Sequence, residues 1–190
     1  MTIKILAISG GLRAASTNSA LLRAARQLAP EGVEIEIYEG IRDLPFFDED
    51  LEGDVPAAVT ELRERIRDAD GVLIASPEYN YSIPGALKNL LDWASRPYGQ
   101  SFLTDKPVAI MGASGSQFGT VRAQNHLRDV FHWLDSKVVT KPEVHVGANY
   151  TRFDEQGNLT DETSRGLVAG LIAALVVQVR KSRETVGASA

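Results

Sequence analysis

Short apolar runs that suit buried β-strands alternate with helical patterns along the whole chain. The runs cover residues 3–9, 33–38, 71–76, 107–111 and 137–146, the last interrupted at Pro142. Between them, apolar side chains recur at the three- and four-residue spacing of an amphipathic helix. Strands separated by helices form a parallel sheet through right-handed crossovers. The pattern therefore predicts an α/β fold with a doubly wound, five-stranded parallel sheet in the order 2-1-3-4-5.

The amino-acid composition narrows the functions open to such a fold. With 190 residues, 44% of them hydrophobic, the chain can bury one core, and we expect a single domain over residues 1–190. A formal net charge of -5 disfavours binding to nucleic acid or to anionic membranes. The absence of cysteine excludes disulfides, thiol catalysis and iron–sulfur clusters, so any redox chemistry requires a borrowed cofactor.

The apolar segments predict neither an export signal nor a membrane span. Residues 1–9 lack a basic leader and a cleavage site, and they suit a buried strand better than a signal peptide. The best candidate span, residues 167–179, is shorter than a bilayer requires. We therefore expect a cytoplasmic protein without a membrane partner.

The loop after the first strand has the composition of an anion site. Residues 9–18 combine two glycines, several hydroxyls, an amide and one cation, Arg13, directly before a predicted helix. A helix N-terminus contributes about half a unit of positive charge, and arginine contributes a full one, which suits a terminal phosphate. The loop has neither the dinucleotide fingerprint nor a P-loop ending. The alternative is an ordinary strand-to-helix turn with capping residues.

Two further loops are expected to meet the first one, because in this strand order the loops after strands one, three and four share an edge of the sheet. Residues 77–85 place two tyrosines and polar amides between prolines, which suits the wall of a planar heterocycle. Residues 112–119 are small and flexible enough to approach a ligand closely. Taken alone, each could be a plain surface loop, but together they predict one shared ligand site.

At these residues the sequence resembles the NADPH-dependent FMN reductase family, close to its chromate and quinone reductases. The resemblance spans nearly the whole chain and is most specific at residues 9–18, 76–93 and 122–124. It implies a flavodoxin-like fold, bound FMN, and NADPH or NADH as co-substrate. The implied phosphate ligands are Ser9, Arg13, Ser16, Asn18 and Ser19; Pro77, Glu78, Tyr79, Asn80 and Tyr81 would border the flavin, and Ser114 and Gly115 its other margin. The family usually has serine where Gly11 stands, which predicts weaker FMN binding unless a backbone N–H replaces that donor.

No residue of the three loops has the character of a nucleophile or a tuned acid–base pair, so the predicted chemistry belongs to the cofactor. The resemblance implies a ping-pong cycle. NAD(P)H delivers hydride to the flavin N5 and leaves, and a small acceptor then takes its place and is reduced by the flavin. Quinones, azo compounds, ferric chelates and chromate are the acceptors expected. One alternative is a flavodoxin-like electron carrier without NAD(P)H oxidation, which Arg13 argues against because flavodoxins bind phosphate without a cation. Another is a flavodoxin-like scaffold with no cofactor.

The resemblance also implies a homodimer or homotetramer, formed through the helices that begin near Pro84 and Gly119. Trp93, Phe131 and Trp133 are the apolar candidates for that contact, although aromatic rings serve protein cores equally well. We expect no metal site. The three histidines, His126, His132 and His145, are too dispersed to share an ion and are interpreted as structural or solvated.

Overall fold

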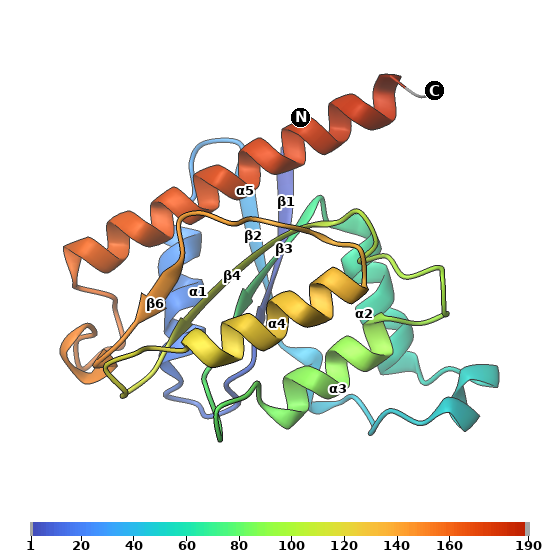
Figure 1. Ribbon diagram of the computed structural model, residues 1–190, viewed down its shortest axis with the longest axis horizontal. Helices are drawn as coiled ribbons and strands as arrows, with labels where there is room; N and C mark the ends of the chain where they lie inside the picture. Colours follow the sequence, from blue (N-terminus) through green and yellow to red (C-terminus); the bar gives the residue numbers. More distant parts are fainter. Residues whose placement is uncertain (1, 189–190) are drawn as a thin grey trace.

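A computed structural model describes residues 2–188, which form a parallel sheet with helices on both faces (Figure 1). The strand order is β2-β1-β3-β4-β5, with β6 also paired to β4. The strands are β1 (Ile3–Ser9), β2 (Val33–Tyr38), β3 (Gly71–Ala75), β4 (Pro107–Ala113), β5 (Lys137–Val138) and β6 (Val144–Val146). The main helices are α1 (Thr17–Gln27), α2 (Ala57–Asp68), α3 (Gly85–Ala94), α4 (Val121–Trp133) and α5 (Glu162–Ala188). The predicted fold class and strand order are confirmed.

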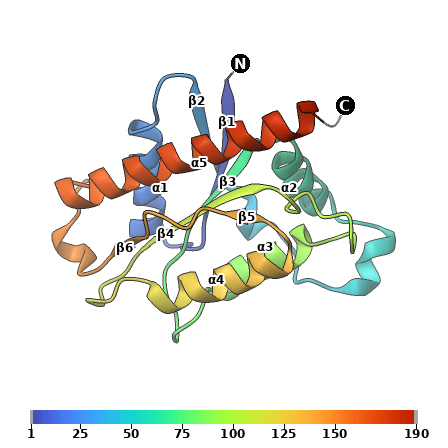
Figure 2. The same cartoon turned by 45° about the horizontal axis from the view of Figure 1, so that its top comes forward.

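The helices divide the core into two layers, one on each face of the sheet (Figures 1 and 2). Helices α1 and α5 pack against one face, with Leu21, Leu22 and Leu171 among their buried side chains. Helices α2, α3 and α4 cover the other face, with Leu62 and Leu87 in that layer. The central strands β3 and β4 are therefore buried on both sides, which explains why the sequence shows them as unbroken apolar runs.

The predicted fifth strand consists of two short strands. β5 pairs with the start of β4, at Pro107 and Val108, and β6 pairs with its end, at residues 111–113. Pro142 lies between them. Because proline has no N–H to donate to a sheet, the ladder is interrupted there, as the sequence indicated.

Helix α5 corrects one expectation from the sequence. Within residues 2–188, the segment Glu162–Thr185 is long and apolar enough to cross a membrane by length and composition, whereas no segment was expected to be. The expectation failed because the helix extends well beyond residues 167–179. Its apolar side chains Val168, Leu171, Ile172 and Leu175 lie in the core against the sheet, so the length of α5 is explained by packing across one face of the sheet.

The aromatic residues predicted to lie at an oligomer contact divide into two kinds. Trp93 and Phe131 are completely buried in the core layer under α3 and α4. The Trp93 indole N–H donates to the carbonyl of Pro45 at 2.9 Å, which satisfies its polar atom within the chain. These two side chains are core residues, so the contact predicted for them is wrong. Trp133 alone of the three is exposed, at 74%.

Candidate active site

The three loops predicted to share a ligand lie together at the carboxyl edge of the sheet. Backbone hydrogen bonds connect neighbouring strands up to that edge: the N–H of Gly10 donates to Ala75 and the N–H of Ser76 donates to Met111, at 2.8 and 3.0 Å. Gly10 is packed so closely against the second loop that an added Cβ would lie 3.3 Å from the Pro77 ring. Glycine is therefore what lets the first two loops approach each other.

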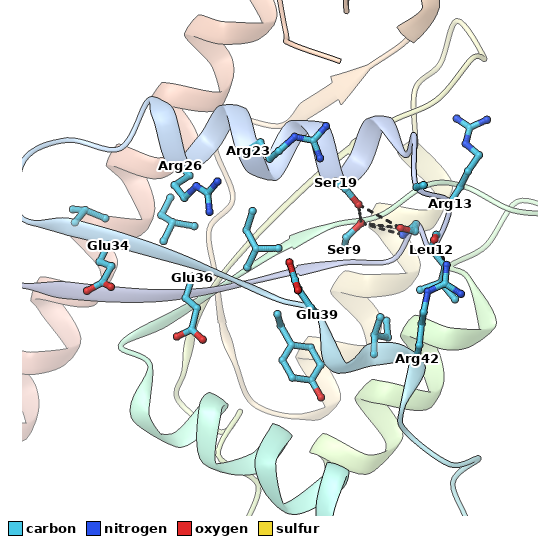
Figure 3. A pocket seen from close by; sticks show the side chains of 17 residues that line it. Ser9, Leu12, Arg13, Ser19, Arg23, Arg26, Glu34, Glu36, Glu39 and Arg42 are labelled. Atoms are coloured by element: carbon cyan, nitrogen blue, oxygen red, sulfur yellow. Dashed lines mark hydrogen bonds between the residues drawn. The ribbon is translucent and has the colours of Figure 1, made fainter. Parts of the chain in front are cut away.

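The first loop ends at an open helix N-terminus. Ser16 is the N-cap of α1 and its hydroxyl accepts a bond from the N–H of Ser19. The first N–H groups of a helix have no partner within it, so they are available to an anion. The hydroxyls of Ser9 and Ser19 lie 2.9 Å apart beside this helix start, as Figure 3 shows. This end of the site therefore offers hydroxyls and the positive end of a helix, with no acidic residue between positions 9 and 19.

The Ser16 hydroxyl fills the space that a side chain at position 11 would need. A Cβ at position 11 would overlap with the Ser16 hydroxyl oxygen. A serine at position 11 would therefore compete with the N-cap hydroxyl for the same space. The weaker FMN binding expected from Gly11 stays a prediction.

Asn18 and Arg13 have different surroundings. The amide of Asn18 is buried and exchanges two hydrogen bonds with the backbone of Ala113, at 2.9 and 3.0 Å. That side chain therefore joins α1 to the end of β4, and a phosphate would meet only its backbone N–H. Arg13 is exposed, and among the described residues its side chain donates only to the carbonyl of Ala15, at 3.2 Å. Its charge is free to act on a ligand.

The second loop is a tight hairpin that displays two tyrosines. Tyr79 and Ser82 exchange backbone hydrogen bonds at 2.9 Å, and between them Asn80 and Tyr81 have φ values of 51° and 65°. Two residues of positive φ are typical of a type I′ turn, and they cost free energy when neither is glycine. Both tyrosines are exposed, Tyr81 at 66%. The strained turn thus holds aromatic rings at the edge of the site.

Glu78 connects this hairpin to helix α4. Its carboxylate accepts hydrogen bonds from the backbone N–H groups of Arg122 and Ala123 and from the Arg122 guanidinium, at 2.9, 3.2 and 3.2 Å. The N-cap residue Thr120 makes no side-chain cap, so Glu78 serves that purpose from a distant loop. The Glu78 side chain is accordingly engaged with α4, and only its backbone can border a ligand.

Arg122 packs its guanidinium against aromatic rings at the edge of the site. Its guanidinium lies over the Tyr81 ring, 4.0 Å from the centroid, and 5.9 Å from that of Phe118. Sequence reasoning noted Arg122 only as part of the family resemblance and gave it no role. The composition of the loops carries no sign of this contact, because it joins residues from two loops and a helix.

The third loop is attached to the first through Asn149. Asn149 donates its backbone N–H to Ser114 at 3.1 Å and its side-chain amide to the Thr17 hydroxyl at 2.8 Å. Ser114 is half-buried and Gly115 is exposed beside it. Nothing in the sequence pointed to Asn149, since it begins a single turn of 3-10 helix, Asn149–Thr151, after the last strand.

Two histidines have defined partners. His126 Nδ1 lies 2.9 Å from the hydroxyl of Ser82, at the base of the hairpin. His145 is half-buried beside Glu143, and burial lowers its pKa while Glu143 opposes the shift. Within residues 2–188, no group of three or more His, Asp or Glu side chains is placed to hold a metal ion.

Comparison with known proteins identifies the family. The family model for NADPH-dependent FMN reductase matches residues 3–151. The chain is 48% identical over 182 residues to an NAD(P)H-dependent FMN reductase of Pseudomonas aeruginosa, covering 95% of this chain and 97% of the relative. This chain belongs to the NADPH-dependent FMN reductase family.

Two further relatives extend the match within the family. A quinone reductase of Escherichia coli is 38% identical over 175 residues, covering 90% of this chain and 93% of the relative. The structure of a flavoenzyme NAD(P)H:(acceptor) oxidoreductase from Paracoccus denitrificans superposes with a TM-score of 0.87 at 33% identity, covering 95% and 99% of the two chains. The predicted class of activity, an NAD(P)H-dependent FMN or quinone reductase, is confirmed.

The geometry of this FMN reductase fits its cofactor. A phosphate needs several donors and positive charge, which the hydroxyls, the helix start and Arg13 provide, and a flavin ring needs flat walls, which the hairpin provides. The individual ligands remain predictions. The structure brings all the predicted residues to one edge of the sheet, but it directs the side chains of Asn18 and Glu78 toward the protein itself.

Proposed function

We propose that this protein binds FMN across the three loops and uses NADH or NADPH to reduce quinones. One observation carries the proposal. The loop and helix N-terminus at residues 9–19, which suit a phosphate, lie at the same edge of the sheet as the tyrosine hairpin. FMN, when bound, supplies the two-electron chemistry that the side chains of this chain lack. No residue is assigned a covalent part in the reaction.

The chain's own residues bind and orient in this proposal. Ser9, Ser16 and Ser19 would donate to the phosphate together with the first N–H groups of α1, and Arg13 would balance its charge. Tyr79 and Tyr81 would flank the ring, while the backbone of residues 77–80 would border its polar edge. Ser114 and Gly115 would approach from the third loop. The hairpin is exposed, which leaves room for two substrates to use one face in turn.

Quinones are the acceptors that the relatives favour. The Escherichia coli relative bears the name quinone reductase, and the Paracoccus denitrificans flavoenzyme uses NAD(P)H with an acceptor. Chromate, azo compounds and ferric chelates belong to the proposal on the resemblance alone. We also propose a cytoplasmic location, where NADH and NADPH are available.

The visible spectrum of the purified protein tests the proposal. We expect flavin absorption that persists through gel filtration and disappears on anaerobic addition of NADPH or NADH. Arg13→Glu should weaken FMN binding by about tenfold or more, because it replaces a charge-assisted contact with repulsion. Arg180→Glu, at an exposed position on α5, is the matched control and should bind FMN normally. Unchanged FMN affinity in Arg13→Glu would contradict the assignment of the phosphate site.

Turnover separates an enzyme from an electron carrier. We expect steady-state NADPH oxidation with 1,4-benzoquinone as acceptor, at a rate that depends on bound FMN. A flavin-loaded protein that oxidises neither NADH nor NADPH in the presence of the quinone would instead be a carrier.

We propose in addition that the protein is a homodimer or homotetramer. A groove of about 790 Å³ between α3 and α4 is bordered by the exposed rings of Trp133 and Tyr98, and large exposed aromatic side chains are typical of interfaces. Sedimentation at micromolar concentration should give at least twice the chain mass, and Trp133→Ser should shift it toward the monomer. A monomeric mass for the unmodified protein would refute this part of the proposal.

A further inference from the structure

A second groove continues from the first loop along the outer side of the sheet (Figure 3). It has a volume of about 840 Å³ and lies between helix α1 and β2, the edge strand. Ser9, Leu12 and Ser19 line the end next to the proposed phosphate site. The groove therefore shares its loop end with the proposed phosphate site and does not contain the tyrosine hairpin.

The floor of this groove is apolar. Along β2, the side chains of Val33, Ile35 and Ile37 face α1, and Val33 and Ile37 are only partly buried. Figure 3 shows Glu34 and Glu36 pointing to the opposite side of the strand, where Glu36 pairs with Arg65 of α2. Glu34 and Glu36 also line the groove, but the alternation of the strand turns their carboxylates away from α1 and leaves an aliphatic surface facing that helix.

Four arginines surround the groove, and none of them forms an ion pair with a carboxylate of the described residues. Arg23 and Arg26, one turn apart on α1, make no hydrogen bond or ion pair within the described chain, and Arg13 and Arg42 donate only to backbone carbonyls. Most other arginines of this acidic protein, at positions 65, 67, 96, 122, 152, 165 and 183, pair with carboxylates. Unpaired positive charge gathered around one cavity favours an anionic ligand.

Glu39 adds a different kind of group at the end of β2. Its carboxylate projects into the groove (Figure 3) and forms no ion pair with the four arginines. In dinucleotide-binding sheets, an acidic residue placed after the second strand binds the hydroxyls of a ribose. An apolar floor, a carboxylate and several arginines together suit a base, a sugar and a phosphate.

We propose that this groove binds an adenosine 5′-phosphate group. Its phosphate lies at the loop end near Arg42, its ribose hydroxyls bind Glu39, and its purine rests on Val33 and Ile37 beneath the arginines of α1. Guanidinium planes stack on aromatic heterocycles, which gives Arg23 and Arg26 a role beyond charge. Two molecules contain this group: FAD, whose FMN half would fill the neighbouring site, and NAD(P)H. The inference rests on the proposed function only for that neighbouring FMN.

Titration calorimetry with AMP tests the groove directly. The probe is added to FMN-loaded protein and to protein freed of FMN, so that a failure of FMN binding is seen separately from a failure of the groove. We expect AMP to bind both forms, and Arg23→Ala/Arg26→Ala to weaken it by about tenfold or more without changing FMN affinity. Arg180→Ala is the matched control and should bind AMP normally. Absence of AMP binding, or equal affinity in the double variant, would overturn the proposal.

A second variant tests the position of the sugar. The unmodified protein should prefer AMP over its 2′,3′-dideoxy analogue, and Glu39→Gln should reduce that preference. An equal affinity for the two nucleotides in the unmodified protein would refute the assignment of Glu39.

Two further titrations identify the source of the adenylate. If FAD binds FMN-free protein more tightly than FMN does, and Arg23→Ala/Arg26→Ala removes the difference, the ligand is FAD. If 2′,5′-ADP binds FMN-loaded protein more tightly than AMP does, and NADP⁺ displaces it, the ligand is NADPH. Either result would support an adenosine 5′-phosphate site in the groove. If the double variant changes neither FAD nor NADP⁺ binding, the groove serves no adenylate ligand.

Discussion

Removing the Glu78 carboxylate is expected to destabilise the fold as well as the candidate site. In Glu78→Ala, two backbone N–H groups at the start of α4 lose their acceptor, and the Arg122 guanidinium loses its ion pair. The Glu78 side chain is only 9% exposed, so water replaces these bonds incompletely. The helix start and the hairpin that carries Tyr81 would both be loosened.

The expected loss can be estimated from the individual contacts. An N-terminal cap contributes about 1 kcal/mol, and a hydrogen bond to a charged group about 1.5–3 kcal/mol. Because the bonds share one carboxylate, we expect a total near 2–3 kcal/mol rather than their sum. For a protein of this size each kcal/mol lowers Tm by about 2–4 °C, so Tm should fall by roughly 4–12 °C. Glu78→Gln keeps an oxygen acceptor and should lose about half as much.

Urea unfolding of the FMN-free protein provides the measurement. Arg122→Ala should cost less than about 1 kcal/mol, because its side chain is 41% exposed and exposed ion pairs contribute little. Glu78→Ala should therefore remain costly in an Arg122→Ala background. Asp92→Ala, which breaks the exposed pair with Lys88, is the control and should change stability by no more than about 0.5 kcal/mol.

Two results would refute this reasoning about Glu78. A loss below about 0.5 kcal/mol in Glu78→Ala would show that the cap of α4 is unimportant. A loss in Arg122→Ala equal to that in Glu78→Ala would show that the ion pair, not the backbone bonds, carries the effect.

Three other substitutions have outcomes that follow from contacts in the structure. Gly11→Ser should lower the free energy of unfolding by about 1–2 kcal/mol, because the new side chain displaces the Ser16 cap. Adding Ser16→Gly to the same chain should restore most of that loss. If the two losses add in urea unfolding, the overlap between positions 11 and 16 is refuted. Asn18→Ala should lose about 2–4 kcal/mol by leaving both backbone partners at the end of β4 unsatisfied, and a loss under about 1 kcal/mol would contradict the buried bonds. Burial lowers the pKa of His145, so the stability it contributes is complete above its ordinary pKa of 6.5 and is lost as the pH falls below that value. His145→Gln should therefore flatten the fall in Tm between about pH 7.5 and about pH 5, whereas the same change at the exposed His132 should not.

The arrangement of the sheet followed from the sequence because it depends on local patterns that repeat. Apolar runs between helical segments allow few topologies, and the right-handed crossover rule removes most of those. Once the order was fixed, the three loops had to meet at one edge. Residues such as Ser9, Ser16 and Arg13 could then be assigned to a site from composition and position alone.

The direction of individual side chains did not follow from the sequence. Asn18 and Glu78 have the chemistry of ligands, yet in the structure one binds the backbone of β4 and the other caps α4. Trp93 and Phe131 suit an interface by residue type, yet they lie in the core. Such choices depend on which backbone groups of distant segments lack partners, and those groups are known only when the segments have packed.

The sequence by itself therefore determined the fold class, the edge that holds the site and the residue types gathered there, because hydrophobic periodicity and turn residues act over short stretches of chain. Tertiary structure decided which polar side chains remain free for a ligand. It also created the groove beside α1, whose arginines and Glu39 are brought together from a helix, a strand end and two loops. Packing of distant segments, which no local pattern encodes, is the physical reason for the difference.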